Sequence, residues 1–167
     1  MDPTAPEGCS LSAGPAADPQ APYVRVAVVG LICRPDGDEL RWLLLHRTQP
    51  FEAWDPPGGR MEAGEDLTAA VTREIQEETG LAVEVAGPCY AFLTFYKGER
   101  LLAVSMACRA AGDPDAIRLE EDGPEEWLWA TGAEWQESAS KGLSSWDPAD
   151  VKKAMRAVAA VWEATEG

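Results

Sequence analysis

Histidine and closely spaced cysteines, the usual ligands of a structural zinc ion, are scarce in this chain of 167 residues. The chain has one histidine, His46, and four scattered cysteines, Cys9, Cys33, Cys89 and Cys108, with no Cys-x-x-Cys pair. A zinc centre and a disulfide framework are therefore not expected. Cys33, Cys89 and Cys108 each lie in an apolar run, which predicts small thiols packed in the core.

Basic residues are also few, because 14 Lys and Arg face 29 Asp and Glu, for a formal net charge of −15. This balance argues against a nucleic-acid backbone or an anionic membrane as the main partner. The sequence has no apolar run long enough to span a membrane. The N-terminus shows no basic region followed by an apolar core, the pattern of a signal peptide. We expect a cytoplasmic protein with no nucleic-acid and no membrane partner.

The first 22 residues contain few side chains that could bury surface. Prolines recur there among alanine, glycine, serine and aspartate, at Pro3, Pro6, Pro15, Pro19 and Pro22. This composition predicts a flexible N-terminal tail over residues 1–22, with a docking segment as the alternative. Residues 23–167 are long enough for one domain with a full core.

Strands alternate with helices along the domain. The β-branched and apolar runs predict strands over 24–33, 40–47, 81–85, 90–96, 101–109 and 127–130. A helix is expected to begin near Glu65 or Asp66 and to end at Gly80, and a second begins at Asp147-Pro148. Residues 51–59 and 113–124 read as loops. This order predicts a mixed sheet between helices, an α/β/α sandwich.

The most informative stretch is 59–81, GRMEAGEDLTAAVTREIQEETGL. On a helix, Glu74, Glu77 and Glu78 fall on an arc of about 100° within one turn, and Val71 and Ile75 face the sheet. A Glu-rich helix face is most often simply solvated. The alternative is a site for a hard divalent cation, because such a cation converts the repulsion between the carboxylates into attraction. Gly58 and Gly59 allow close backbone approach, and the Gly58 carbonyl could supply a further oxygen ligand.

The same residues resemble the Nudix box, G-x5-E-x7-R-E-U-x-E-E-x-G-U, in which U is bulky and apolar. Every position is matched, by Gly59, Glu65, Arg73, Glu74, Ile75, Glu77, Glu78, Gly80 and Leu81. The segment Trp54-x-x-Pro57-Gly58-Gly59 also resembles the family's approach to the box. The resemblance implies the Nudix fold and a nucleotide hydrolase that uses Mg²⁺, with Mn²⁺ as the alternative metal. It assigns the metal to Glu74, Glu77 and Glu78, an orienting role to Glu65 and a structural salt bridge to Arg73.

The general base is less directly indicated. Some Nudix enzymes use a box glutamate, and others use a carboxylate from a loop late in the sheet. The loop candidates here are Glu120, Glu121, Glu125 and Glu126, each of which could also be a solvated surface charge. We favour Glu121, because its loop could move over the metal.

Residues outside the box bear on the substrate. Arg47, at the end of a predicted strand, is a candidate phosphate-binding group, and Phe51 and Trp54 could stack a nucleobase or serve packing alone. Tyr96 lies 16 residues beyond Gly80. In the family, a tyrosine near this position accompanies activity on dinucleoside polyphosphates, whereas a proline accompanies activity on ADP-ribose.

The substrate we expect is therefore a nucleoside diphosphate linked to another moiety, with a leaning toward dinucleoside polyphosphates. A (d)NTP or damaged-nucleotide pyrophosphohydrolase is the first alternative. A non-catalytic nucleotide-binding module is the second, although such modules usually lose box carboxylates and this chain keeps them all. The family resemblance is also compatible with a homodimer.

Overall fold

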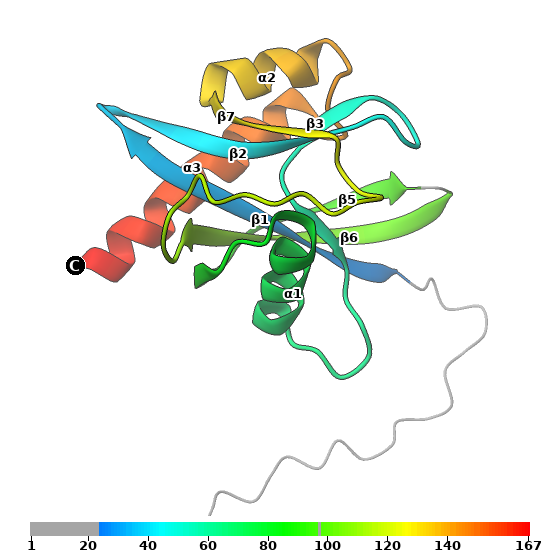
Figure 1. Ribbon diagram of the computed structural model, residues 1–167, viewed down its shortest axis with the longest axis horizontal. Helices are drawn as coiled ribbons and strands as arrows, with labels where there is room; N and C mark the ends of the chain where they lie inside the picture. The colour runs from blue at the N-terminus through cyan, green and yellow to red at the C-terminus, as the bar shows by residue number, and fades with distance from the viewer. Residues whose placement is uncertain (1–23, 97) are drawn as a thin grey trace, which may run out of the picture.

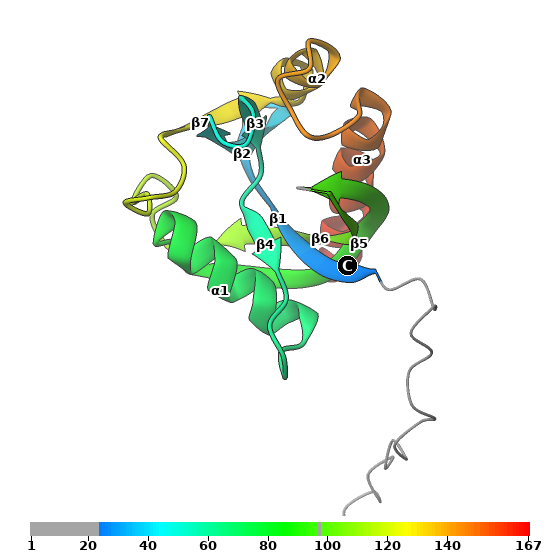
Figure 2. The ribbon, with the colours of Figure 1, turned by 90° about the vertical axis from the view of Figure 1, so that its right-hand side faces the viewer.

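A mixed β-sheet lies between helices in the computed structural model, which describes residues 24–96 and 98–167. Helix α1 (Leu67–Thr79) covers one face, and α3 (Pro148–Glu166) covers the other. The short helix α2 (Gly132–Ser140) packs against α3 and β7 (Glu126–Thr131). Figures 1 and 2 show α1 and α3 on opposite sides of the strands. The predicted α/β/α sandwich is confirmed, whereas the predicted tail at 1–22 lies outside the described residues.

Strand β1 (Arg25–Asp36) organises the sheet. It pairs in parallel with β6 (Glu99–Ala110), which pairs antiparallel with β5 (Val83–Tyr96) at one edge of the sheet. On its other side, residues 33–36 of β1 pair with β2 (Glu39–Arg47), and residues 27–29 pair with β4 (Gly58–Arg60). Strands β3 (Ala53–Asp55) and β7 pair with β2. The sheet therefore divides along β1, with β2 and β4 following one another on the same edge.

Side chains alternate between two cores along the central strands, as the two-residue period of a strand requires. Leu31, Leu44 and Ala107 join a cluster with α2 and α3, which includes Trp135, Val158 and Trp162. Their sequence neighbours join a second cluster with Val71 and Ile75 of α1, namely Ile32, Leu43, Leu45, Met106 and Cys108. Of the cysteines predicted to pack in the core, Cys33 and Cys108 are buried and Cys89 is partly buried.

Helix α1 has the bounds that its capping residues predict. The Asp66 side chain accepts a hydrogen bond from the Ala69 N–H at 2.7 Å, and Gly80 ends the helix with φ of 69°. Gly30 on β1 lets the helix lie close to the sheet, because a Cβ at that position would lie 2.5 Å from the Ile75 Cδ1 atom. Val71 and Ile75 are fully buried there, as their positions on the helix predict.

Four local predictions are wrong. The segments 81–85 and 90–96 form one strand, β5, in which bulges between Val85 and Gly87 and between Pro88 and Tyr90 accommodate the expected break. The predicted loop at 51–59 contains β3 and β4, which form by pairing with distant strands. The helix count of two omitted α2. Strand β1 also continues to Asp36, beyond the predicted strand end at Cys33. Within the described residues, no helix is both long and apolar enough to cross a membrane.

Candidate active site

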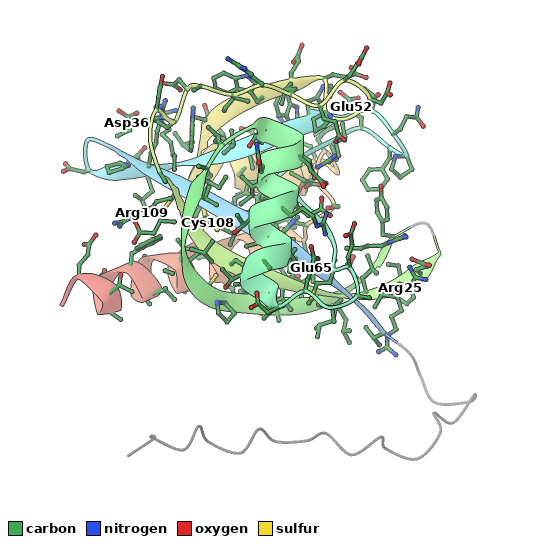
Figure 3. All side chains as sticks on the ribbon, turned by 60° about the horizontal axis from the view of Figure 1, so that its bottom comes forward. Arg25, Asp36, Glu52, Glu65, Cys108 and Arg109 are labelled. Atoms are coloured by element: carbon green, nitrogen blue, oxygen red, sulfur yellow. The ribbon has the colours of Figure 1, made fainter. Side chains whose placement is uncertain are left out.

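Arg73 joins most of the box carboxylates into one network. Its guanidinium donates to Glu65 at 2.5 and 3.0 Å, to Glu74 at 3.0 Å and to Glu77 at 3.3 Å. It also donates to the carbonyl oxygen of Arg60 on β4 at 3.1 Å. Arg73 therefore ties α1 to β4 and orients Glu74 and Glu77. Figure 3 shows Glu65 at the N-terminal end of α1, which is how it reaches Arg73 two turns along the helix.

Glu78 faces a different cation. One oxygen of its carboxylate accepts a hydrogen bond from the Arg47 guanidinium of β2, and the other accepts a hydrogen bond from the Gly58 N–H at 3.3 Å. The Glu78 side chain is only 7% exposed, which makes it the most buried carboxylate of the box. Arg47 and Glu78 lie far apart in the sequence, so only the fold brings the phosphate-binding candidate onto the metal-binding candidate.

The backbone of β4 turns polar atoms toward α1. The Gly30 N–H donates to the Pro57 carbonyl and the Met61 N–H donates to the Val26 carbonyl, so alternate residues of this stretch bond to β1. Gly58 and Arg60 lie between those pairs, so their N–H and C=O groups point away from β1. The contacts of Gly58 N–H with Glu78 and of Arg60 C=O with Arg73 agree with this alternation. The Gly58 carbonyl is thus on the side of the strand that faces the carboxylates.

Gly59 makes the closest approach between β4 and the helix. A Cβ built on Gly59 would lie 2.4–2.5 Å from the carboxylate atoms of Glu74. Any side chain at this position would therefore fill the space that the Glu74 carboxylate uses. This explains physically why a glycine stands at the first position of the box.

Burial and charge shift the pKa values of these carboxyls in opposite directions. Burial raises the pKa of Glu78 to about 7, although the Arg47 guanidinium opposes this shift. Burial also raises the pKa of Glu74, against the effect of Arg73. The hydrogen bond from Arg73 lowers the pKa of Glu65 to about 2. Glu74 and Glu78 are thus carboxyls whose charge the fold does not fully compensate, which favours a further cation beside them.

As they stand, the carboxylates do not converge on one point. Among residues 24–96 and 98–167, no three His, Cys, Asp or Glu side chains form a ready metal cage. Glu74 and Glu77 turn toward Arg73, and Glu78 turns toward Arg47. A metal ion held by all three would have to draw Glu78 away from Arg47.

A cavity of about 210 Å³ opens beside β4, where the sheet divides. Gly58 and Gly59 line it on the side of the box, and Arg47 reaches it from β2. Aromatic side chains line much of the rest: Phe51, Phe92, Phe95, Tyr96 and Trp146. The loop between β2 and β3 and the hairpin between β5 and β6 project on the same side of the molecule, where the cavity lies between them (Figure 1).

The structure therefore brings three of the four predicted substrate-binding residues, Arg47, Phe51 and Tyr96, to one cavity. Trp54 lies elsewhere. Its ring stacks on His46, with ring centroids 4.6 Å apart, and it lines a separate cavity beside α2. The packing alternative for Trp54 therefore matches its position better than the stacking of a nucleobase.

Sequence reasoning missed Phe92 and Trp146, whose rings lie 4.5 Å apart at this cavity. The position of Phe92 could have been predicted, because Phe92, Thr94 and Tyr96 are every second residue of one strand and therefore share one face of the sheet. Trp146 lies in the segment between α2 and α3, and its position depends on tertiary packing against Trp135.

The acidic loop at 113–124 lies against the last turn of α1. The Arg118 N–H donates to the Thr79 carbonyl at 2.8 Å, and the Glu120 N–H donates to the Glu78 carbonyl at 3.3 Å. Glu121 follows and is exposed. Glu125 accepts a hydrogen bond from the Thr48 hydroxyl at 2.7 Å, next to Arg47. The loop thus carries several carboxylates past the metal-binding end of the helix without fixing one of them as the base.

Comparison with known proteins gives a consistent picture. The NUDIX domain family model matches residues 24–146. An RNA pyrophosphohydrolase of Caulobacter vibrioides is 32% identical over 126 residues, covering 65% of this chain and 72% of the relative. An asymmetrical bis(5′-nucleosyl)-tetraphosphatase of Caenorhabditis elegans is 27% identical over 108 residues, covering 62% of this chain and 78% of the relative.

Solved structures agree on the fold. The crystal structure of a C. elegans Ap4A hydrolase binary complex superposes with a TM-score of 0.67 at 20% identity, over 82% of this chain and 99% of that chain. A Nudix hydrolase of Nitrosomonas europaea gives 0.63, also at 20% identity, over 86% and 90%. With the family match across most of the domain and the intact box on α1, the chain belongs to the Nudix family, as a hydrolase that acts on phosphoanhydride bonds.

Proposed function

We propose that this Nudix hydrolase uses Mg²⁺, or Mn²⁺ in its place, to cleave the phosphate chain of a dinucleoside polyphosphate. One observation carries the proposal: the aromatic cavity and the box carboxylates share the wall formed by Gly58 and Gly59. These glycines line the cavity on one side, while Gly58 contacts Glu78 and Gly59 lies against Glu74 on the other. A nucleoside bound in the cavity would extend its phosphates directly to the carboxylates.

The donor set suits a hard divalent cation. Glu74, Glu77 and Glu78 offer carboxylate oxygens, and the Gly58 carbonyl faces the same side, which fits the oxygen ligands that Mg²⁺ takes in proteins. Because Gly59 has no side chain, the Glu74 carboxylate has room to lie against β4 at this position. When bound, the metal would supply charge neutralisation of the phosphates and activation of the attacking water.

The other residues orient these ligands and the substrate. Arg73 holds Glu74 and Glu77 from the far side and anchors them to Arg60 on β4. Arg47 lies between Glu78 and the cavity, so it can neutralise a substrate phosphate once Glu78 turns to a metal. Phe51 and Tyr96 supply aromatic surface for a base at the mouth of the cavity.

Glu121 remains our proposed general base. Its loop is hydrogen-bonded to the last turn of α1, which places the loop near the reacting end of the helix. If Glu121 removes the proton from water, Glu121→Gln should lower kcat, whereas Asp122→Asn, at the next exposed carboxylate of the same loop, should leave kcat unchanged and serve as the control. If both variants lose kcat equally, or if neither variant loses kcat, Glu121 is not the general base.

The direct test is a substrate panel. The protein is incubated with Mg²⁺ and diadenosine tetraphosphate, ADP-ribose, ATP, dNTPs or 8-oxo-dGTP, and the products are resolved by anion-exchange chromatography. We expect the highest kcat/KM for diadenosine tetraphosphate, with release of ATP and AMP or of two ADP. Preference for ADP-ribose or for a mononucleotide would overturn this assignment. Binding without any product would favour the non-catalytic module.

The second candidate is a pyrophosphohydrolase that acts on a free 5′-triphosphate end, either in a (d)NTP or in RNA. The relative named RNA pyrophosphohydrolase supports this reading, since it is 32% identical. The net charge of −15 disfavours a long RNA partner. The panel therefore also includes a 5′-triphosphorylated oligoribonucleotide, for which we expect a lower kcat/KM than for diadenosine tetraphosphate. Dimerisation stays a prediction from the family resemblance.

A further inference from the structure

Strand β5 lies at an edge of the sheet, and part of it lacks the features that usually prevent an edge strand from pairing. Among the strands of the described residues, β5 pairs with β6 alone. Natural proteins protect such edges with charged side chains, prolines or bulges. The bulges of β5 end at Tyr90, and the segment 91–95, AFLTF, contains no charged residue and no proline. The backbone of this segment is therefore suited to accept a further strand.

The same segment exposes apolar side chains on one face of the sheet. Phe95 is 74% exposed, Leu93 is 55% exposed, and Ala91 is exposed as well. They lie on the face that α1 covers, because Ala91 pairs with Val104 of β6, which packs against the core cluster of α1. The tip of the β5–β6 hairpin extends past α1 (Figure 1), so the helix leaves this strip uncovered. An exposed apolar strip of this kind marks a protein contact.

The segment is complementary to itself when two copies run antiparallel. A two-fold axis beside Leu93 pairs Leu93 with Leu93 of a second copy, and Phe95 with Ala91 of that copy. On the other face of the strand, the same register pairs Phe92 with Thr94 of the second copy. Each phenylalanine thus lies opposite a smaller side chain, and no like charges meet. A symmetric contact requires such self-complementarity, which favours a second copy over an unrelated partner.

We propose that two copies of this chain dimerise by antiparallel pairing of their β5 strands about Leu93, so that the two sheets become one. This interface goes beyond the proposed function and does not depend on the substrate. Phe92 and Thr94 line the cavity, so the pairing sets the cavities of the two copies side by side. The chain's own residues 1–22 suit the edge less well, because their five prolines provide no N–H for a ladder.

The charge of the chain gives this dimer a characteristic dependence on salt. Each copy carries a net charge of −15, so two copies repel each other at long range. Added salt screens that repulsion and leaves the apolar contacts and the backbone ladder in place. The dimer should therefore tighten as NaCl rises to about 0.5 M, whereas a contact made by ion pairs would weaken.

Sedimentation equilibrium of the full chain, at up to about 500 μM, measures the Kd of the dimer. Leu93→Lys places two like charges opposite each other at the axis, and symmetry puts the change into the interface twice. We expect this variant to raise the Kd at least about tenfold. The matched control is Leu128→Lys, at another exposed leucine that lies on β7, and it should leave the Kd unchanged. Circular dichroism checks that both variants are folded.

A pair of substitutions tests the register. Ala91→Glu and Phe95→Lys should each weaken the dimer when made alone, because each places a charge against an apolar side chain. In the double variant, a glutamate and a lysine face each other on both sides of the axis, so it should dimerise more tightly than either single variant. The two positions are about 13 Å apart along one strand, so they do not pair within one chain.

The outcomes decide between this dimer and its alternatives. A parent that stays monomeric at every concentration and at high salt overturns the inference and leaves the edge to a different partner. A parent dimer whose Kd is unchanged by Leu93→Lys has its interface elsewhere, which also overturns it. A double variant that dimerises no more tightly than the single variants overturns the pairing about Leu93. The substrate panel is read separately, so failure of the dimer and failure of the proposed function are distinguishable.

Discussion

Replacing Gly59 with alanine should separate catalysis from folding. The new Cβ would lie 2.4–2.5 Å from the Glu74 carboxylate, whereas ordinary contacts of this kind lie at 3.4–4 Å. Glu74 must therefore retreat by about 1 Å or change rotamer and lose its 3.0 Å contact with Arg73. The fold can absorb this change, because the obstructing group is the end of a side chain and not backbone.

The expected cost falls on the chemical step. A misplacement of about 1 Å in a catalytic group lowers the rate by roughly 10²-fold, which corresponds to about 2.7 kcal/mol of lost transition-state stabilisation. We therefore expect Gly59→Ala to lower kcat/KM for the preferred substrate of the panel about a hundredfold, with a Tm within about 3 °C of the parent. Initial rates by chromatography and thermal unfolding by circular dichroism measure the two quantities.

A second glycine provides the matched control. A Cβ on Gly132 would lie 2.8 Å from the Met155 sulfur, again the flexible part of a side chain, but at α2 and away from the box. Gly132→Ala should keep its activity within about twofold, since Met155 can shift without touching the site. Full activity in Gly59→Ala would show that the position of Glu74 does not matter for catalysis and would refute the reasoning.

Three further predictions concern the carboxylate network. Arg73→Ala removes the contacts with Glu65, Glu74 and Arg60 and should cost about 2 kcal/mol of stability, seen as a Tm lower by roughly 4–8 °C; an unchanged Tm would contradict the network. The pKa of Glu65 is about 2 in the fold, below its ordinary 4.5, so its ionised form stabilises the metal-free fold above about pH 4.5 and this stability is lost as pH falls toward 2. Glu65→Gln should therefore flatten the acid limb of a urea-unfolding series measured against pH, and an unaltered slope would disprove the contact. Glu77→Gln should lower kcat by about 10²-fold or more with no loss of fold, because it removes an anionic ligand of the metal that neutralises the reacting phosphate; a variant as fast as the parent would exclude Glu77 from the mechanism.

Local signals made α1 and its carboxylates predictable. The spacing of Glu74, Glu77 and Glu78 depends only on helix geometry, and Asp66 and Gly80 mark the helix ends through contacts within the same turn. The same kind of local signal was present for α2, where Thr131 and Glu134 form a capping box. That helix is short, and only Trp135 and Ala139 are buried in it, so its apolar period was too brief to recognise.

The rest of the site depends on long-range pairing. Strands β3 and β4 each span three residues and exist through their ladders with β2 and β1. No local pattern shows that Arg47 reaches Glu78, 31 positions away, or that Trp146 closes the cavity against Phe92. The net charge of −15 argues only against a nucleic-acid backbone or an anionic membrane as the main partner. A net charge does not show where single charges lie, and the fold brings Arg25 and Arg60 together beside Glu99.

The central claim is that Glu74, Glu77 and Glu78 together hold a divalent metal against the substrate phosphates. Calorimetric titration of Mg²⁺ into the protein saturated with the methylene-bridged diadenosine tetraphosphate tests it most directly, with Glu163→Gln on α3 as the control of equal charge. We predict that replacement of any one of the three glutamates by glutamine weakens Mg²⁺ binding at least about tenfold, while Glu163→Gln leaves the isotherm as in the parent. Isotherms that stay unchanged in all three variants would contradict the claim.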